Sequence, residues 1–294
     1  ARRLVTALRD PPEGRDLDAL LNFGVVNLDK PPGPSAHQVA GWVRDLAGVD
    51  RAAHAGTLDP KVTGCLPTTL GDATRLAPVF LEGHKEYVAV LECHGRPPAD
   101  LDATVAEFEG EIYQKPPRKS AVARRLRTRT IHDLDVLETR DRRVLLRIEC
   151  ASGTYVRKLC HDLGLALGVG AHMGALRRTA TDPFDDRDLV TLHDLADALA
   201  FADEGDEGPI RAIVAPAERV LEGLPAVTIA PSAAEQVATG APVYAPGVID
   251  AEPAGDDALV ACVTPNGSAV CLGRLVGDPE ADEGVVVELE RVLV

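Results

Sequence analysis

The chain of 294 residues is strongly acidic, with 46 aspartates and glutamates against 31 lysines and arginines and a formal net charge of −15. Its length is sufficient for one large domain and one small one, and its 45% of hydrophobic residues are enough to fill a core. No run of about 18 apolar residues predicts a membrane-spanning helix, and the charged start of the chain lacks the apolar core of a secretory signal. We therefore expect a cytoplasmic protein that does not contact a membrane.

The numbers and positions of the cysteines and lysines narrow the expected class of protein further. The six cysteines include no Cys-x-x-Cys pair, so we expect buried, reduced thiols and neither a disulfide framework nor a metal site. Only six of the basic residues are lysines. An acidic, lysine-poor surface stays hydrated in concentrated salt, where its self-repulsion is screened. This composition predicts a protein from a salt-loving organism.

Charge is distributed unevenly along the chain. From Ala200 onward there are 17 acidic residues against four arginines, whereas the preceding part is nearly balanced. Such asymmetry is typical of two domains of different character. We predict a catalytic domain over residues 1–216, with an N-terminal extension over 1–20, and a second domain over residues 217–294.

The first predicted elements are a strand over residues 22–28, a stiff loop over 29–34 with three prolines and a glycine, and a helix. Ser35 is the expected N-cap of this helix, and Gln38 is at the position that completes a capping box. The helical spacing of the apolar residues predicts a buried face. The residues of this expected face are Val39, Trp42, Val43 and Leu46.

The middle of the chain mixes strands and helices. Residues 87–93 and 144–150 alternate and are rich in β-formers, so both segments are predicted to be strands. A helix follows the second strand, with an apolar stripe of Val156, Leu159, Cys160, Leu163 and Leu167. Thr191 is expected to cap another helix. Because there is no regular βαβ rhythm, the pattern favours an α+β fold over a doubly wound sheet.

The last third is predicted to be mainly β-structure. Ser232 and Glu235 predict the start of a short helix that ends at Gly240. Two β-runs, 258–264 and 268–276, flank an Asn-Gly pair that is typical of a hairpin. Residues 284–294 are expected to form a final strand. A small β-barrel with one capping helix accounts for this pattern.

A rigid loop over residues 54–64 carries a single carboxylate, Asp59. Gly56 and Gly64 allow the backbone to bend and to approach a ligand closely, and Pro60 keeps Asp59 out of the helical conformation. An ordinary Asp-Pro turn is the alternative interpretation.

A second segment, 152–157, places Arg157 at the start of the helix after the 144–150 strand. A helix N-terminus is an unfavourable site for a cation, so we expect Arg157 to have a carboxylate partner. A guanidinium can bind a carboxylate through two hydrogen bonds, fix its rotamer and keep it ionised.

The stretch from Ile112 to His132 contains no acidic residue. A basic block within an acidic protein is typical of a surface that binds nucleic-acid phosphates, and a second basic pair near residue 177 is expected to extend it. The predicted RNA-binding residues are Lys115, Arg118, Lys119, Arg124, Arg125, Arg127, Arg129, Arg177 and Arg178.

Five segments in this order resemble motifs of the TruB/dyskerin family of pseudouridine synthases. They are residues 28–33, 54–64, 85–87, 152–157 and 168–178. Residues 113–129 resemble a segment of the archaeal and eukaryotic dyskerin-like branch, and the C-terminal part is similar to a PUA domain. The chain thus resembles the catalytic subunit of archaeal H/ACA ribonucleoproteins.

This resemblance implies an α+β pseudouridine synthase fold, with a mixed, largely antiparallel sheet and flanking helices, followed by a PUA-like β-barrel. It implies that uridine is isomerised to pseudouridine without a cofactor. The implied catalytic residues are Asp59 as the essential carboxylate, Arg157 as its partner and Tyr87 as the residue that stacks on the base. The implied substrate-binding residues are His54, Lys30, Tyr155 and Leu176, with Lys30 as a structural or electrostatic support near the site.

The implied partners are an H/ACA guide RNA, an rRNA or tRNA substrate and the small accessory proteins of the particle. Two other functions remain open at this point. One is a stand-alone synthase that modifies the T-loop of tRNA, and the other is a catalytically silent RNA-binding scaffold.

Overall fold

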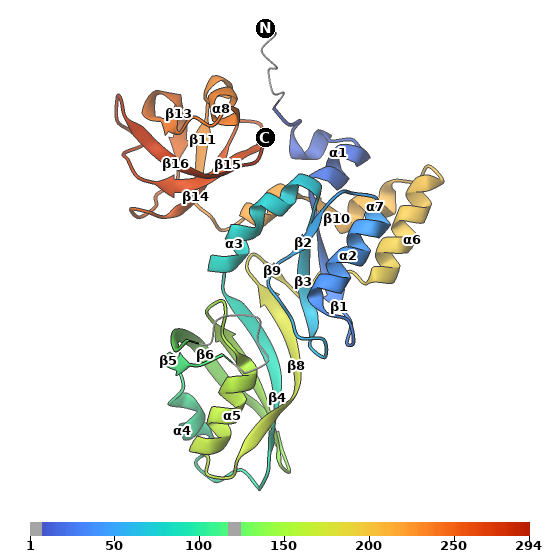
Figure 1. The fold of residues 1–294 in the computed structure, drawn as a ribbon, viewed down its shortest axis with the longest axis vertical. Coiled ribbons are helices and arrows are strands. Elements are labelled where there is room, and N and C mark those ends of the chain that lie inside the picture. The colour runs from blue at the N-terminus through green and yellow to red at the C-terminus, as the bar shows by residue number, and fades with distance from the viewer. Residues whose placement is uncertain (1–7, 117–124) are drawn as a thin grey trace.

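The computed structural model describes residues 8–116 and 125–294, whose strands form two sheets (Figure 1). The larger sheet has ten strands and the smaller has six. The strands of the larger sheet are β1 (Gly24–Lys30), β2 (Ala52–His54), β3 (Thr63–Leu70), β4 (Lys85–Cys93), β5 (Gly110–Gln114), β6 (Arg127–Arg140), β7 (Arg143–Cys150), β8 (Ala171–Thr181), β9 (Phe184–Asp185) and β10 (Val214–Pro216). The strands of the smaller sheet are β11 (Ala226–Ile229), β12 (Val243–Tyr244), β13 (Val248–Ala251), β14 (Leu259–Val263), β15 (Ala269–Leu275) and β16 (Val285–Val292).

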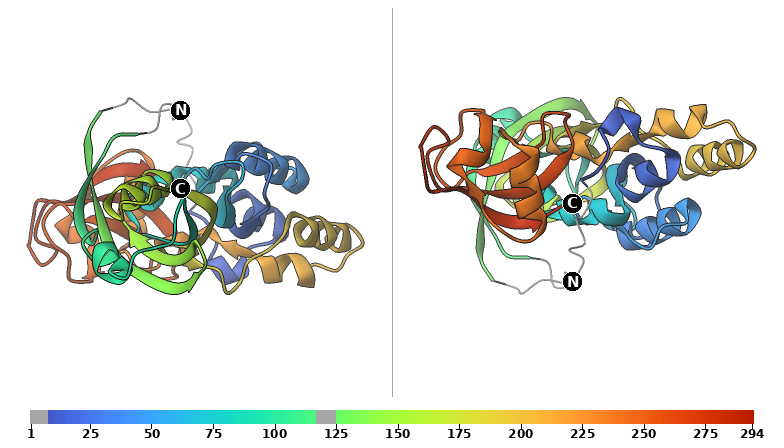
Figure 2. Two further views of the ribbon diagram at one scale, coloured as in Figure 1. Left: turned by 90° about the horizontal axis from the view of Figure 1, so that it is seen from below. Right: turned by 90° about the horizontal axis from the view of Figure 1, so that it is seen from above.

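Helices flank both sheets. The α-helices are α1 (Leu17–Asn22), α2 (Ala36–Ala47), α3 (Ala77–Glu82), α4 (Leu101–Ala106), α5 (Val156–Ala166), α6 (Leu192–Asp203), α7 (Gly208–Ile213) and α8 (Pro231–Ala238). The short 3₁₀ turns are η1 (Pro12–Gly14), η2 (Gly71–Leu76), η3 (Ala217–Leu221) and η4 (Ala245–Gly247). Both views in Figure 2 place the C-terminal sheet on the opposite side of the molecule from α6 and α7.

The larger sheet consists of two half-sheets that meet at a short parallel junction. Its main strand order is β10-β1-β3-β8-β4-β7-β6-β5, and its named pairings are antiparallel except for β3 with β8. That parallel pairing has only two residue pairs, Thr63 with Arg177 and Gly64 with Arg178. The predicted mixed, largely antiparallel sheet is confirmed. The junction directly follows the loop that carries Asp59.

The alternation predicted for β4 and β7 is present in the structure. Every second residue of each strand is buried, and these residues form one core with α5. The helix contributes the predicted apolar stripe, because Val156, Leu159, Cys160 and Leu163 are all buried. Since α5 packs mainly against β8, its N-terminus is fixed relative to the half-sheet that carries Tyr87.

Helix α2 confirms its predicted cap but only part of its predicted face. Ser35 and Gln38 form the complete capping box, and Val39 and Val43 are buried. Trp42 and Leu46, however, are 45% and 41% exposed, so the prediction that they are buried is wrong. The buried stripe runs along Val39, Val43 and nearby alanines. At about 100° per residue, Trp42 and Leu46 therefore lie at the margin of this stripe.

The C-terminal sheet contains the predicted hairpin, in which β14 and β15 pair antiparallel, and the predicted last strand, β16. The predicted start of α8 at Ser232 is wrong. The helix begins at Pro231 with Ala230 as N-cap, because a proline at the first helical position has its φ angle already set for the helix. Gly240 follows the helix with a φ of +95°, and its N–H donates to the Val237 carbonyl.

The N-terminal segment connects the two sheets. Arg9 and Arg15 lie over the ring of buried Phe23 near the start of β1, with 4.1 and 5.3 Å from each guanidinium carbon to the ring centre. Arg9 also donates to the Leu293 carbonyl at 2.8 Å, and Arg15 forms an ion pair with Glu218. Apolar residues of both sheets share one buried cluster here, so the two sheets pack together as one body.

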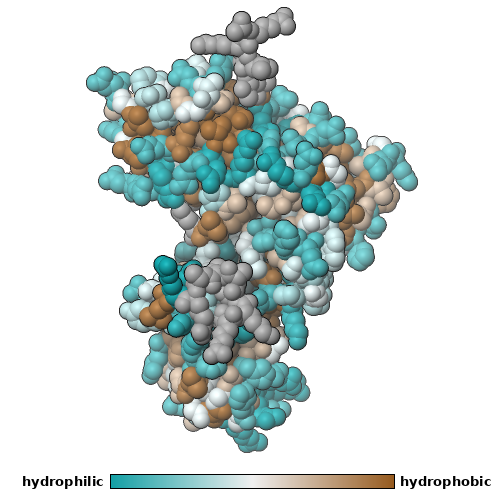
Figure 3. Space-filling model, in the orientation of Figure 1, coloured by the Kyte–Doolittle hydropathy of each residue, from teal (hydrophilic) through white to brown (hydrophobic). Residues whose placement is uncertain are grey.

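All six cysteines are free thiols and buried. Within residues 8–116 and 125–294, none of the helices has the length and apolarity needed to cross a membrane. Hydrophilic residues cover most of the face displayed in Figure 3, as the acidic composition predicts.

Candidate active site

The loop between β2 and β3 presents Asp59 beside the end of β1. Lys30, the last residue of β1, is fully buried, and its ammonium group donates to the carbonyl oxygens of Pro60 at 3.0 Å and Val62 at 2.8 Å. The Val62 N–H donates to the Asp59 carbonyl at 2.9 Å and closes the turn. Lys30 was grouped with the substrate-binding residues as a structural or electrostatic support near the site. Its complete burial excludes direct contact with substrate, and its hydrogen bonds agree with the supporting role, because Lys30 anchors the loop from inside.

Arg178 supports the same loop from beneath. It is buried, and its guanidinium donates to the carbonyl oxygens of Cys65 at 2.7 Å and Gly56 at 3.4 Å. Gly64, with a φ of +100°, lies so close to β8 that a Cβ would lie 2.2 Å from the Arg178 carbonyl oxygen. The prediction that Arg178 lies on an RNA-binding surface is therefore wrong. Its strand position turns the side chain inward, where backbone carbonyls satisfy its charge.

Arg157 in the first turn of α5 forms an ion pair with Asp59. The predicted pairing is present in the structure. Both side chains are about half exposed, at 45% and 48%. A ligand can therefore reach the carboxylate while the guanidinium binds it. An ion pair with this exposure contributes only about 0.2–1 kcal/mol to stability, so its arrangement has little value for folding alone.

Tyr87 lies beside Arg178 at the inner edge of the site. The two residues are direct cross-strand neighbours in β4 and β8. Burial raises the pKa of the Tyr87 hydroxyl, although the charge of Arg178 opposes this shift. Tyr87 is therefore a neutral phenol at physiological pH. Arg178 connects it to the Asp59 loop through Gly56.

His54 ends β2, opposite Thr68 of β3. Its Nδ1 atom is buried without a hydrogen-bond partner. Burial lowers the pKa of His54, and the positive charge of Arg178 and the neighbouring His37 lower it further. The imidazole is therefore neutral at pH 7, and one of its ring nitrogens is buried and unpaired.

The other two predicted substrate-binding residues border the same region. Tyr155 is the N-cap residue of α5, two positions before Arg157. Leu176 on β8 lies opposite Ala89, two residues beyond Tyr87 along β4. Both Tyr155 and Leu176 are partly buried. The fold thus brings residues from β1, β2, β4, β8 and α5 around one loop.

The predicted basic surface is only partly described. Lys115 and Arg125 are exposed, Arg127 and Arg129 are partly buried, and Arg118, Lys119 and Arg124 lie outside the described residues. The Arg129 guanidinium lies against Gly153, in the turn that leads into α5.

Arg177 is neutralised by an acidic neighbour. It forms a two-point ion pair with Asp29, at 2.9 and 3.1 Å, and this hydrogen bonding raises the pKa of Arg177. Its charge is therefore less available to a phosphate than that of an unpaired arginine.

Two buried polar residues near the site were missed by the sequence analysis. Lys85 starts β4 and donates to the carbonyl oxygens of Phe80 at 3.0 Å and Gly83 at 2.9 Å, and burial lowers its pKa to about 8. Gln114 ends β5 and hydrogen bonds to the backbone of Tyr155. The available signal was their position, since Lys85 begins the 85–87 motif and Gln114 lies within the 113–129 segment.

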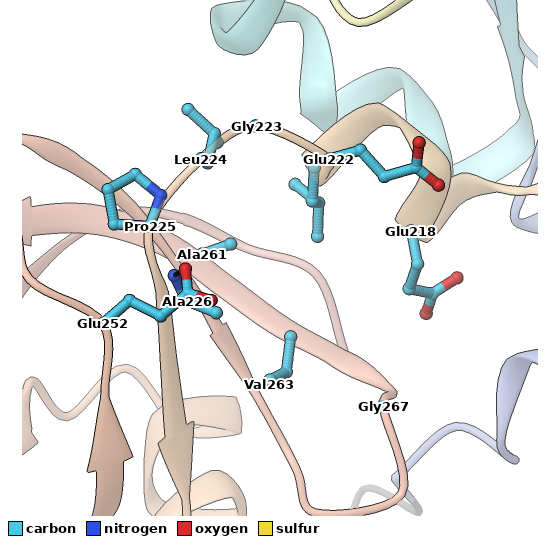
Figure 4. Close-up of a pocket in the computed structure, with 11 residues that line it drawn as sticks. Glu218, Glu222, Gly223, Leu224, Pro225, Ala226, Glu252, Ala261, Val263 and Gly267 are labelled. Carbon is cyan, nitrogen blue, oxygen red and sulfur yellow. Dashed lines mark hydrogen bonds between the residues drawn. The ribbon is translucent and has the colours of Figure 1, made fainter.

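A separate hollow of about 520 Å³ lies between the segment 218–226 and the C-terminal sheet (Figure 4). Its polar lining comes from Glu218, Glu222 and Glu252, which makes it unsuitable for phosphate. Glu218 and Glu252 accept hydrogen bonds from the backbone N–H groups of Ala269 and Ala226. Across the described part of the chain, no group of three or more His, Cys, Asp or Glu residues is arranged to hold a metal ion.

Comparison with known families assigns most of the chain. Residues 44–98 and 94–156 match the model of the TruB family pseudouridylate synthase N-terminal domain, and residues 157–222 match the C-terminal domain of tRNA pseudouridylate synthase B. Residues 9–40 match the DKCLD (NUC011) domain, and residues 225–293 match the PUA domain.

Individual relatives are similar over nearly the whole chain. The chain is 68% identical to a probable tRNA pseudouridine synthase B of Haloarcula marismortui, covering 98% of this chain and 94% of the relative. It is 67% identical to the protein of that description from Halobacterium salinarum, covering 98% and 99%. The source organisms of these relatives are consistent with the salt-loving character predicted from composition.

Two solved structures are likewise similar over nearly the whole chain. A crystal structure of a Cbf5-Nop10-Gar1 complex contains a chain that superimposes with a TM-score of 0.92 at 43% identity, covering 98% of this chain and 90% of that one. A structure of an H/ACA RNP bound to a substrate RNA containing 2′-deoxyuridine matches with a TM-score of 0.90 at 42% identity, with the same coverage.

The fold and the half-exposed carboxylate on its anchored loop define an RNA-modifying isomerase, a pseudouridine synthase joined to a PUA domain. The chain belongs to the TruB family of pseudouridylate synthases.

Proposed function

We propose that Asp59 is the essential carboxylate of the isomerisation and that Arg157 fixes its position. The observation that carries this proposal is their ion pair on a loop anchored by two buried cations, Lys30 and Arg178. In the reaction, the bond between N1 of uracil and C1′ of the ribose breaks, the base turns over, and a bond from C5 to C1′ forms. The C5 proton leaves and N1 gains a proton. Atoms and electrons balance within the nucleotide, so the reaction requires no cofactor.

The other site residues are assigned by position. A uridine in a helix must leave its stack to reach Asp59, and the site must exclude water during bond exchange. Tyr87, as a neutral phenol, stacks on the extruded base. His54, which is uncharged, stabilises the nucleotide outside its helix. Tyr155 and Leu176 form the walls of the base pocket.

We infer that the substrate is rRNA, selected by an H/ACA guide RNA, and that small accessory proteins complete the particle. This inference is supported by the similarity to solved chains in a Cbf5-Nop10-Gar1 complex and in an H/ACA RNP with substrate RNA. Stand-alone modification of tRNA is the second candidate, because the curated relatives are described as probable tRNA pseudouridine synthases.

The acidic surface places a physical condition on RNA binding. With a net charge of −15, and in concentrated salt, counterion release contributes little to affinity. Shape, stacking and hydrogen bonds therefore supply most of the RNA-binding energy.

We place the boundary between the catalytic and PUA domains between residues 216 and 217, after the last strand of the larger sheet. We place the enzyme in the cytoplasm.

The decisive experiment compares wild type, Asp59→Asn and the exposed control Asp50→Asn, each assembled with guide RNA and accessory proteins. Mass mapping of the RNA measures pseudouridine directly. We expect no product with Asp59→Asn and normal product with Asp50→Asn. Wild-type product from Asp59→Asn would contradict the assignment. A parallel reaction with the purified chain and tRNA alone separates the two substrates, and absence of pseudouridine in every RNA would identify a scaffold.

A further inference from the structure

Gln114, the last residue of β5, makes two hydrogen bonds to the backbone of one residue. Its Oε1 accepts from the Tyr155 N–H at 2.9 Å, and its Nε2 donates to the Tyr155 carbonyl at 3.2 Å. The side chain is 1% exposed. A buried amide that uses both its donor and its acceptor on the backbone of one residue fixes the position and the orientation of that backbone.

The residue that Gln114 contacts begins the helix that carries Arg157. Tyr155 is the N-cap residue of α5, and α5 has no side-chain cap of its own. The Tyr155 carbonyl also accepts from the N–H groups of Lys158 at 2.9 Å and Leu159 at 3.0 Å, which start the helix. Gln114 therefore acts from another strand on the first turn of α5, where a helix ordinarily uses a local cap.

The turn before Tyr155 is attached to the neighbouring strand. The Ala151 N–H donates to the Thr130 carbonyl of β6 at 2.9 Å, and the Thr154 hydroxyl donates to the Ala151 carbonyl at 2.7 Å. Gln114 itself pairs with Arg127 of β6. The entry to α5 is thus fixed at two points, by β6 before the turn and by Gln114 at the helix start.

We propose that Gln114 is a positioning residue for the isomerisation, which sets the direction from which Arg157 approaches Asp59. This proposal rests on the function proposed for that ion pair. The pair is half exposed, so its own energy is too small to define one geometry against solvent. The backbone that carries Arg157 must therefore supply the geometry, and Gln114 is a side chain that connects this backbone to the sheet.

The chemistry of the contact selects glutamine. Asparagine is one methylene shorter and does not span the distance from β5 to Tyr155. Ionised glutamate keeps the acceptor for the Tyr155 N–H but has no proton for the Tyr155 carbonyl. Methionine has a similar length but offers no strong hydrogen bond. These differences provide a graded set of substitutions at one buried position.

The test uses Gln114→Met and Gln114→Glu, with Gln236→Met as a matched change at an exposed position of α8. Each variant is assembled with the RNA and accessory proteins that the wild type requires. Single-turnover rate at saturating RNA, RNA dissociation constant and unfolding midpoint are measured separately. A displacement of about 1 Å at Arg157 lowers the rate by up to about 100-fold. We expect at least a tenfold loss of rate for Gln114→Met, a smaller loss for Gln114→Glu, and unchanged RNA affinity.

A double-mutant cycle with Arg157→Met distinguishes positioning from general damage. If Gln114 acts through Arg157, Gln114→Met lowers the rate of the Arg157→Met enzyme little further. Full additivity, or a normal rate in Gln114→Met, would overturn the proposal. If Gln114→Met does not fold, Gln114→Glu in the same cycle decides. Failure of the proposed function has a different signature, namely wild-type activity in Asp59→Asn.

Discussion

Replacing Arg157 by lysine separates the catalytic value of the ion pair from its structural value. The substitution keeps the positive charge but removes the planar guanidinium that can bind a carboxylate at two points. Because Arg157 and Asp59 are 45% and 48% exposed, we expect the free energy of unfolding to fall by less than about 1 kcal/mol. A misoriented carboxylate is far more costly to the reaction. We expect the isomerisation rate to fall about 10–100-fold, which corresponds to about 1.4–2.7 kcal/mol of activation free energy.

Single-turnover conversion of uridine at saturating RNA measures the rate, and urea denaturation of the same preparation measures stability. Arg44→Lys is the control, because Arg44 and Asp45 form a similarly exposed pair on α2. It is expected to leave the rate unchanged. An Arg157→Lys enzyme with the wild-type rate would refute the argument, and so would a loss of activity that merely follows a large loss of stability.

Three further predictions concern the residues around the loop. Lys30→Met removes a charged donor from two loop carbonyls, and we expect denaturation to report a loss of about 2 kcal/mol or more; unchanged stability would contradict the anchoring role. Gly64→Ala is expected to lower the free energy of unfolding by about 3 kcal/mol, since the new Cβ meets the Arg178 carbonyl. Gly33 has a φ of +114° and open space around it, so Gly33→Ala is expected to show backbone strain alone, at about 1 kcal/mol. Equal effects of the two substitutions would refute the close approach at Gly64. NMR titration is expected to give His54 a pKa below 6.5. Unfolded His54 then binds a proton at higher pH than folded His54, so its stabilising contribution is present above pH 6.5 and is lost as the pH falls below that value; a midpoint above 6.5 would contradict the burial argument.

Local features of the fold were predictable because their signals lie within a few neighbouring residues. The predicted capping box at Ser35 and the predicted cap at Thr191 are present, and so is the hairpin of β14 and β15. The failures are also local in cause. Helix α8 begins at Pro231 and is not capped by Ser232, because a fixed φ angle outweighs a side-chain cap. The orientation of α2 about its axis leaves Trp42 at the margin of the core.

The site was predictable in part. The association of Asp59 with Arg157 was predicted because their segments resemble family motifs in order, and 98 residues of sequence separate them in the chain. Their spacing alone contains no information about contact. The acidic, lysine-poor composition similarly predicted the salt-loving character that the halophilic relatives share.

The sequence by itself determined the acidic, salt-loving character of the protein, the alternation of its strands and the caps of its helices. It also determined which loop carries the reactive carboxylate. Tertiary structure alone decided which polar and charged side chains are buried. Nothing in their neighbouring sequence marks Lys30, Arg178 and Gln114 as buried residues. Each nevertheless lies inside and binds backbone groups that are distant in the sequence. The physical reason is that a buried polar group is stable only where folding delivers its hydrogen-bond partners, and those partners are set by sheet register and helix packing rather than by sequence neighbours.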